Sequence, residues 1–326
     1  MKLYRNVLSF LALCLIWGST WLGIKAGIAA VPPLMFAGTR FTAAGVILFI
    51  AASFSKQRPR VAKGDRVRLG VVSLLMIPLC YGPLFWGMLY INSGTAAVLE
   101  MPLTPIALLA FALLLGQERI NPRRVLGIGC GVVGLVILFG PDAFGVSAER
   151  AGSDPMLWLL GTIAVASAAF TYAWGSVLAK PLLNRYPSNF IAGTTMLVGG
   201  LVLIASSLLV EPGAGLALAG RWGTSAWIGW LFLVLFGSLV GYTLYMRLLR
   251  EIGASSAGSY AFVSPIIAVL LGVIVENEAV TVVGIIGMIV MLVGAYLAMQ
   301  GSSGSAREDV PSAEKMVRTP PSAVAS

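Results

Sequence analysis

Two ionisable residues, Arg40 and Glu100, lie inside long apolar stretches of this chain of 326 residues. If these stretches span a membrane, ionisable groups there are unfavourable and usually face the interior of a helix bundle or a wet cavity. One interpretation is a buried ion pair that locks two helices together. Another is a solute cavity, in which Arg40 would bind a carboxylate or another anionic group and Glu100 would bind an amine or take up a proton. Arg40 could also extend outward to the membrane surface.

Aromatic residues inside the same kind of stretch are the second group that could bind a solute. Trp17 and Trp21 lie one helical turn apart near the N-terminus. Aromatic rings in membrane helices often serve packing or form belts at the membrane surface. Large apolar walls with a few polar contacts are also what a site for a small amphipathic solute needs. The candidate substrate-binding residues are Trp17, Trp21, Arg40, Tyr81, Trp86, Glu100, Tyr242 and Tyr260.

The residue types that most enzymes use are scarce. The chain has no His, the commonest general base and metal ligand. Its three cysteines, Cys14, Cys80 and Cys130, lie in apolar runs without CxxC spacing and are interpreted as small core residues. The sequence contains no Walker-type phosphate loop and no basic patch with interleaved aromatic residues. We therefore expect no catalytic residues, metal, cofactor or nucleic-acid partner, and ATP drive would need a separate subunit.

Composition predicts that these residues belong to a membrane protein. With 58% hydrophobic and 11% charged residues, the chain has more apolar surface than one soluble core could bury. Apolar runs of about 20 residues span a bilayer as helices, because each backbone N–H and C=O is satisfied within the segment. After a first helix that includes Trp17, the predicted spans are about 33–53, 68–90, 94–116, 123–140, 156–179, 188–210, 225–247, 255–275 and 279–299. Residues 301–326 are predicted to be a disordered cytoplasmic tail.

An internal repeat divides the spans into two halves, 1–140 and 156–300. Pro105 and Glu118 in the first half recur at the same interval as Pro265 and Glu278 in the second. Because each half has five spans, the second half enters the membrane in the opposite orientation, and such repeats place a substrate site near the midplane. The predicted fold is all-α and integral to the membrane, with ten transmembrane helices arranged as two inverted five-helix repeats.

Charge predicts the orientation of the chain. Most of the 22 Lys and Arg residues fall on the side of the membrane that holds the N-terminus in this arrangement. Lys and Arg near helix ends are retained on the cytoplasmic side, so both termini are expected to be cytoplasmic. The corner at Glu118 falls on this basic side beside Arg119, whereas the corner at Glu278 falls on the acidic side.

These features together resemble the EamA family of the drug/metabolite transporter superfamily. The first helix of each half carries a Trp-Gly-Ser element, at residues 17–19 and 174–176, and the fourth carries the Pro and Glu described above. The resemblance covers roughly residues 7–299. It implies an exporter of amino acids and other small metabolites in the bacterial inner membrane, with a central cavity formed by both halves. Arg40 and Glu100 have Thr195 and Tyr260 as their counterparts, so the chemistry of the two halves differs.

The leading functional hypothesis is a secondary transporter that works by alternating access on a small-molecule substrate, with proton coupling as an additional hypothesis. A transporter or flippase of a lipid-linked or nucleotide-linked sugar and a non-transporting membrane scaffold remain alternatives. Stripes of small residues could serve internal helix packing or a homodimer surface. These stripes are Gly127, Gly131 and Gly134 with Gly287 and Gly294.

Overall fold

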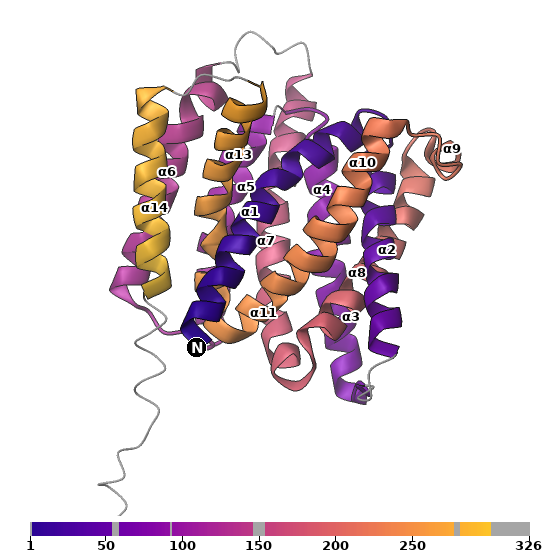
Figure 1. Ribbon diagram of the computed structural model, residues 1–326, viewed down its shortest axis with the longest axis horizontal. Coiled ribbons are helices and arrows are strands. Elements are labelled where there is room, and N and C mark those ends of the chain that lie inside the picture. The colour runs from indigo at the N-terminus through magenta and orange to yellow at the C-terminus, as the bar shows by residue number, and fades with distance from the viewer. Residues whose placement is uncertain (1, 54–58, 92, 146–153, 277–280, 301–326) are drawn as a thin grey trace, which may run out of the picture.

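The computed structural model describes residues 2–53, 59–91, 93–145, 154–276 and 281–300, and these residues form helices without any strand (Figure 1). The elements are α1 (Lys2–Ile28), α2 (Pro33–Ser53), α3 (Lys63–Met76), α4 (Pro78–Gly87), α5 (Ser93–Leu114), α6 (Pro122–Gly145), α7 (Pro155–Arg185), α8 (Ser188–Val210), α9 (Ala214–Ala217), α10 (Thr224–Phe232), the π-helix η1 (Leu233–Tyr242), α11 (Thr243–Ile252), α12 (Ala254–Gly258), α13 (Tyr260–Glu276) and α14 (Val282–Gln300). The predicted tail 301–326 and the corner residue Glu278 lie outside the described residues.

Seven stretches of the described chain are long and apolar enough to cross a membrane. They are Pro33–Ala51, Lys63–Gly87, Pro155–Arg185, Ser188–Val210, Thr224–Ile252, Ala254–Leu271 and Val282–Met299. A shorter apolar stretch, Leu99–Leu114, lies within α5. The all-helical membrane fold expected from composition is confirmed, whereas the arrangement as ten helices in inverted repeats stays a prediction.

Three of the predicted spans change their helix geometry along their length. The third divides at Ile77 between α3 and α4, because Pro78 has no N–H to donate and its ring disfavours a continuous helix. The ninth divides at Ser259 between α12 and α13. The eighth passes from α10 through η1 into α11. π-helical stretches are rare and frequently lie at functional sites, so we expect a functional site near η1.

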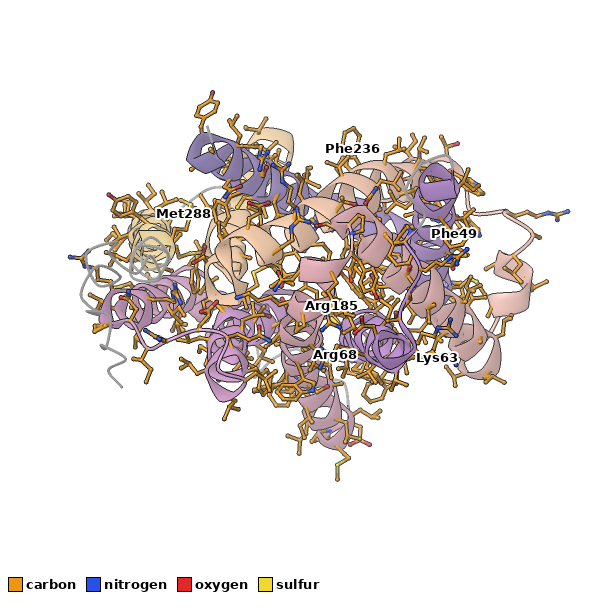
Figure 2. The ribbon with its side chains drawn as sticks, turned by 90° about the horizontal axis from the view of Figure 1, so that it is seen from below. Phe49, Lys63, Arg68, Arg185, Phe236 and Met288 are labelled. Atoms are coloured by element: carbon orange, nitrogen blue, oxygen red, sulfur yellow. The ribbon has the colours of Figure 1, made fainter. Side chains whose placement is uncertain are left out.

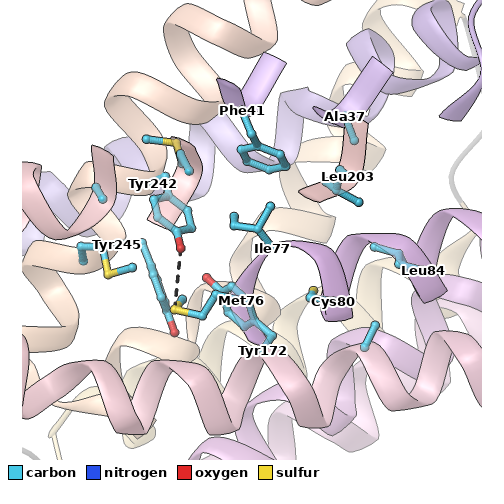
Figure 3. Close-up of a cluster of buried hydrophobic side chains, with 14 of the residues drawn as sticks. Ala37, Phe41, Met76, Ile77, Cys80, Leu84, Tyr172, Leu203, Tyr242 and Tyr245 are labelled. Carbon is cyan, nitrogen blue, oxygen red and sulfur yellow. Dashed lines mark hydrogen bonds between the residues drawn. The ribbon is translucent and has the colours of Figure 1, made fainter. Parts of the chain in front are cut away.

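Helices that are distant in sequence pack side by side. α6 lies along α14 at one edge of the molecule, and α2 lies along α8 towards the other (Figure 1). Between these edges, α1 contacts α10, η1 and α13, while α7 contacts α3, α4 and α5. A large cluster of buried hydrophobic side chains joins α1, α2, α4, α7 and α11, and part of it is drawn in Figure 3.

The glycine stripes are used where α6 meets α14. A Cβ atom at Gly127 would lie 2.8 Å from the Gly294 carbonyl oxygen, and one at Gly287 would lie 2.9 Å from the Gly134 carbonyl oxygen. Backbones this close leave no room for a side chain, so the small residues permit the contact. Internal packing therefore accounts for these stripes, and they give no support to the homodimer surface.

Candidate functional site

A cavity of about 110 Å³ lies between α1, α2, α4, α5, α7, η1 and α13. Six of the eight candidate residues line it, namely Trp17, Arg40, Tyr81, Glu100, Tyr242 and Tyr260. The wall also contains residues outside these eight candidates, among them Thr20, Phe41, Tyr172 and Ser264. The fold thus brings together one cation, one carboxyl group and several aromatic rings from segments far apart in the chain.

Arg40 occupies a buried position on α2, with only 4% of its surface exposed. Its guanidinium carbon lies 4.4 Å from the centroid of the Phe41 ring and 5.4 Å from that of Tyr81. Aromatic faces attract a cation within about 6 Å, which favours this placement. No carboxylate of the described residues lies within 4 Å of the guanidinium, and its Nε atom has no hydrogen-bond partner. Arg40 is therefore held by rings rather than by an ion pair.

Glu100 lines the same cavity from α5, near the prolines that interrupt this helix. One of its carboxylate oxygens accepts a hydrogen bond of 3.3 Å from the hydroxyl of Thr104, which also donates to the Glu100 carbonyl oxygen at 3.0 Å. Among the described residues no cation lies within 4 Å of the carboxylate. Of the alternatives that the sequence left open, the structure has both residues at the cavity and not in a direct ion pair.

The aromatic wall is a group of mutually packed rings around Trp17. Its ring centroid lies 4.6 Å from that of Tyr260 and 5.3 Å from that of Tyr245, and its Nε1 donates to the Gly237 carbonyl oxygen at 3.2 Å. Tyr172 packs against Tyr245 at 5.3 Å. Edge and offset contacts of this kind stabilise ring clusters and fix their orientation.

The set of eight candidates did not include Tyr172 and Tyr245. Tyr172 lies two residues before Trp174-Gly175-Ser176, which echoes the element of Trp17, and this position was the available signal. The hydroxyl of Tyr245 donates to Ser176 Oγ at 2.9 Å, and that of Tyr242 lies 3.7 Å from the Met76 sulfur (Figure 3). These buried tyrosines fill the interior beside the cavity.

Trp86 and Trp21 differ from the other candidates. Trp86 is 38% exposed, does not line the cavity and packs against Tyr90 with ring centroids 5.0 Å apart. At about 100° per residue, Trp86 lies roughly 140° around the helix from Tyr81, which places it on another face of α4. Trp21 lies on α1, but its side chain is outside the described part of the structure.

The cavity lies nearer to one end of the bundle. Its α1 lining runs from Trp17 through Thr20 to Ile24, away from the N-terminus, and on the long helix α7 only Tyr172 reaches it. Towards the end where α1 begins, Met76, Tyr245 and Ser176 are completely buried. We refer below to the end where α1 begins as the basic end, because it displays Lys63, Arg68 and Arg185 (Figure 2).

Two buried carboxylates hold helices together at the basic end. Glu118 accepts from Arg124 at 2.6 Å, from the backbone N–H of Ser255 at 3.2 Å, and from the Ser255 hydroxyl. Asp65 accepts from Arg185 at 3.1 Å and from the hydroxyl of Tyr186. Both links join helices of the 1–140 segment to helices of the 156–300 segment.

At the opposite end, a third carboxylate joins α2 and α8. Glu211, just after α8, accepts from the backbone N–H groups of Leu34 at 2.8 Å and Met35 at 3.1 Å, and from Ser207 Oγ at 2.5 Å. A carboxylate at a helix N-terminus satisfies unpaired N–H groups and complements the helix dipole. Within the described residues, no cluster of three or more His, Cys, Asp or Glu residues could hold a metal ion.

Comparisons with known proteins agree with this architecture. The chain is 32% identical over 302 residues to the uncharacterized inner membrane transporter YedA of Escherichia coli K12, covering 88% of this chain and 90% of YedA. It is 25% identical over 295 residues to the uncharacterized transporter YoaV of Bacillus subtilis, covering 90% and 96% of the two chains. A solved crystal structure with 20% identity superposes with a TM-score of 0.72 over 93% of this chain and 99% of the other.

The family comparison matches most of the chain in two segments. The profile of the EamA-like transporter family matches residues 5–140 and again residues 159–300. This result confirms the resemblance that the Trp-Gly-Ser elements and the repeated Pro and Glu indicated. The chain belongs to the EamA-like transporter family of membrane proteins.

Proposed function

We propose that this protein is a secondary transporter that exports amino acids or similar small amphipathic metabolites or drugs across the bacterial inner membrane by alternating access. The observation that carries the proposal is the placement of Arg40 and Glu100 in one buried cavity without a direct ion pair. A guanidinium binds a carboxylate through charge-assisted hydrogen bonds, and a carboxylate binds an ammonium group in the same way. A zwitterion would satisfy both residues at once, while the rings of Trp17 and Tyr260 contact its apolar part.

The proposed inverted repeats, 1–140 and 156–300, have support from the helix contacts. If the five spans of one half correspond in order to those of the other, α1 corresponds to α7, and α5 to α13. The contacts of α1 with η1 and α13 then match those of α7 with α4 and α5. The pairs α2 with α8 and α6 with α14 join corresponding helices. Such an exchange of contacts is what a two-fold relation between the halves would produce.

We propose further that the basic end faces the cytoplasm, with both termini on that side. Basic residues near helix ends favour this assignment through the positive-inside rule. The cavity would then be nearer to the outer face, and the described structure would represent an outward-facing state. Opening the basic end would require the links from Glu118 and Asp65 across the two segments to break. Alternating access supplies a role for those links, because they are among the contacts that would hold the inner side closed.

A matched set of substrates and variants tests the site. The wild-type protein, Arg40→Gln and Glu100→Gln are reconstituted in liposomes, and counterflow of amino acids, their amides and their N-acetyl derivatives is measured. Removing a charged hydrogen-bond partner weakens binding by about 1.5–3 kcal/mol, or roughly 10- to 150-fold. We expect Arg40→Gln to weaken binding of the amino acid but to leave binding of the amide, which has no carboxylate, almost unchanged. We expect Glu100→Gln to weaken binding of the amino acid but to leave binding of the N-acetyl derivative, which has no ammonium group, almost unchanged.

The proposal depends on whether each substitution affects some compounds more than others. If each substitution weakens the binding of every compound equally, Arg40 and Glu100 do not contact the carboxylate and the amine of the substrate. If the wild-type protein exchanges none of these compounds, zwitterion transport is wrong. Glu100→Gln also tests proton coupling, because transport driven by a pH gradient should be lost while counterflow persists. Unchanged dependence on the gradient would remove Glu100 from the coupling step.

A further inference from the structure

A second hollow lies on the side of the bundle, between α3 and α8. It has a volume of about 420 Å³, and its lining includes Arg66, Leu69, Gly70 and Ser73 from α3 and Thr194 and Val198 from α8. Val198 is 37% exposed, so the groove is open to the surroundings of the bundle. Both helices belong to stretches that can cross a membrane, and those surroundings are therefore lipid.

The wall of this groove between α3 and α8 offers a lipid chain an apolar surface, because its two hydroxyl groups already have hydrogen-bond partners. Ser73 Oγ donates to the Leu69 carbonyl oxygen at 2.8 Å, and Thr194 Oγ1 donates to the Phe190 carbonyl oxygen at 2.9 Å. Each hydroxyl is thus satisfied within its own helix. A Cβ atom at Gly70 would have no neighbour within 4 Å, so the absence of a side chain there leaves the groove open along α3. A hydrocarbon chain can occupy such a groove without burying an unsatisfied polar group.

The end of the groove nearest to the membrane surface is cationic. Arg66 lies in the first turn of α3, about 10 Å along the helix from Ser73 at 1.5 Å per residue. Among the described residues its side chain has one hydrogen bond, which Nε donates to the Val61 carbonyl oxygen at 3.4 Å, and no carboxylate lies within 4 Å. Lys63 and Arg68 are exposed nearby, on the first two turns of α3, but do not line the groove (Figure 2).

The neighbouring acid does not neutralise this charge. Asp65 is buried, and its carboxylate already accepts from Arg185 at 3.1 Å and from the Tyr186 hydroxyl at 2.9 Å. Arg185 and Asp65 thus neutralise each other and leave the charge of Arg66 uncompensated. The mouth of the groove therefore offers an unpaired guanidinium within a positively charged surface.

We propose that the groove binds one anionic phospholipid, with an acyl chain along α3 and α8 and the headgroup phosphate on Arg66. The charge at the mouth complements a phosphodiester, and the volume falls within the range of natural ligand pockets. Basic residues between membrane helices at the membrane surface recognise anionic headgroups, with about 1 kcal/mol for each cation near the surface. This site is separate from the central cavity and does not depend on what the protein transports.

Lipid binding to the purified full-length protein tests the proposal. The protein in neutral detergent is titrated with dioleoylphosphatidylglycerol or with dioleoylphosphatidylcholine, and bound lipids are counted by native mass spectrometry. We expect one phosphatidylglycerol to bind more tightly than phosphatidylcholine. Arg66→Gln should weaken the binding of phosphatidylglycerol about five-fold and leave the binding of phosphatidylcholine unchanged. Gly70→Leu should abolish the tight binding of phosphatidylglycerol, because the added side chain would fill the groove.

Gly129→Leu is the matched control. Gly129 lies on α6, and a Cβ atom there would also meet nothing within 4 Å, so the substitution adds the same side chain to another lipid-facing surface. This variant should bind lipid as the wild type does. Equal binding of the two lipids by the wild type, or wild-type binding by both Arg66→Gln and Gly70→Leu, would overturn the proposal. Displacement of the lipid by an equal concentration of glycerol 1-phosphate would also overturn it, because the acyl chain would then contribute nothing.

Discussion

The hydroxyl of Ser255 provides a sharp test of the proposed inner seal. It donates to the carboxylate of Glu118, and this bond joins the two segments at the basic end. The ion pair between Glu118 and Arg124 lies within one segment, so it would survive an opening that separates the segments. Replacing Ser255 by Ala should therefore destabilise the closed basic end without an equal effect on the open one.

The size of the effect follows from the kind of bond. A hydrogen bond to a charged acceptor contributes about 1.5–3 kcal/mol, which corresponds to roughly 10- to 150-fold in an equilibrium constant. The backbone N–H of Ser255 lies 3.2 Å from the other oxygen of Glu118 and remains in the Ala variant. The lower part of the range therefore applies, and the ratio of outward-facing to inward-facing protein should fall about ten-fold.

Thiol labelling measures this ratio. Thr20 lines the cavity, so Thr20→Cys reports access to it from either side. The native Cys14, Cys80 and Cys130 are replaced by Ala, and an impermeant maleimide is applied to right-side-out and to inverted vesicles. The ratio of the two labelling rates should fall about ten-fold when Ser255→Ala is added.

Ser259→Ala serves as the control for this experiment. Ser259 is also completely buried, but its hydroxyl donates to the Ser256 carbonyl oxygen in the same part of the chain, at 2.7 Å. Its removal should leave the ratio of labelling rates unchanged. An unchanged ratio in Ser255→Ala, or an equal fall in Ser259→Ala, would show that the link to Glu118 does not hold the basic end closed.

Three further outcomes follow from contacts elsewhere in the structure. The double variant Arg40→Gln with Glu100→Gln should raise the thermal midpoint of the detergent-solubilised protein, because two buried charges without ion partners are removed; a lower midpoint would favour a structural pair. Glu211→Gln should lower the unfolding free energy by about 1–3 kcal/mol in denaturant titrations, because the N-terminus of α2 loses a charged acceptor. Gly294→Leu should destabilise the protein far more than Gly129→Leu in the same titrations, since a Cβ atom at Gly294 would collide with the backbone of α6, whereas one at Gly129 would meet nothing within 4 Å; similar losses would contradict the packing described.

The sequence predicted the broad arrangement because its signals are local and strong. Apolar runs of membrane length determine where helices form, and the Trp-Gly-Ser elements with the repeated Pro and Glu identified the family. Arg40 and Glu100 were found for the same reason, since a charge inside an apolar run stands out. That Arg40 lies against the rings of Phe41 and Tyr81 and not against Glu100 could not be predicted. These rings attract the guanidinium only in the folded protein, and nothing in the sequence marks them as its neighbours.

The features that sequence reasoning missed depend on contacts between distant segments. Tyr172 and Tyr245 have ordinary positions within apolar helices, and only their packing against Trp17 and each other places them beside the cavity. Trp86 is a different case, because its five-residue spacing from Tyr81 already puts the two side chains on different faces of a helix, and the candidate set did not use that spacing. The groove between α3 and α8 arises from Gly70 and the packing of two segments, which no single run of residues indicates.

The separation of Arg40 from Glu100 bears directly on how the cavity works. Two opposite charges that share a small buried space would attract each other strongly, and a direct pair would compete with any zwitterion for the same groups. Rings that hold the guanidinium by cation–π attraction compensate part of its desolvation without consuming its capacity to bind a carboxylate. The Thr104 hydroxyl likewise holds one oxygen of Glu100 and leaves the carboxylate without a cation. Under the proposed function, this arrangement would keep both groups available to a zwitterion at some expense of stability, as expected where selection acts on ligand binding rather than on the fold.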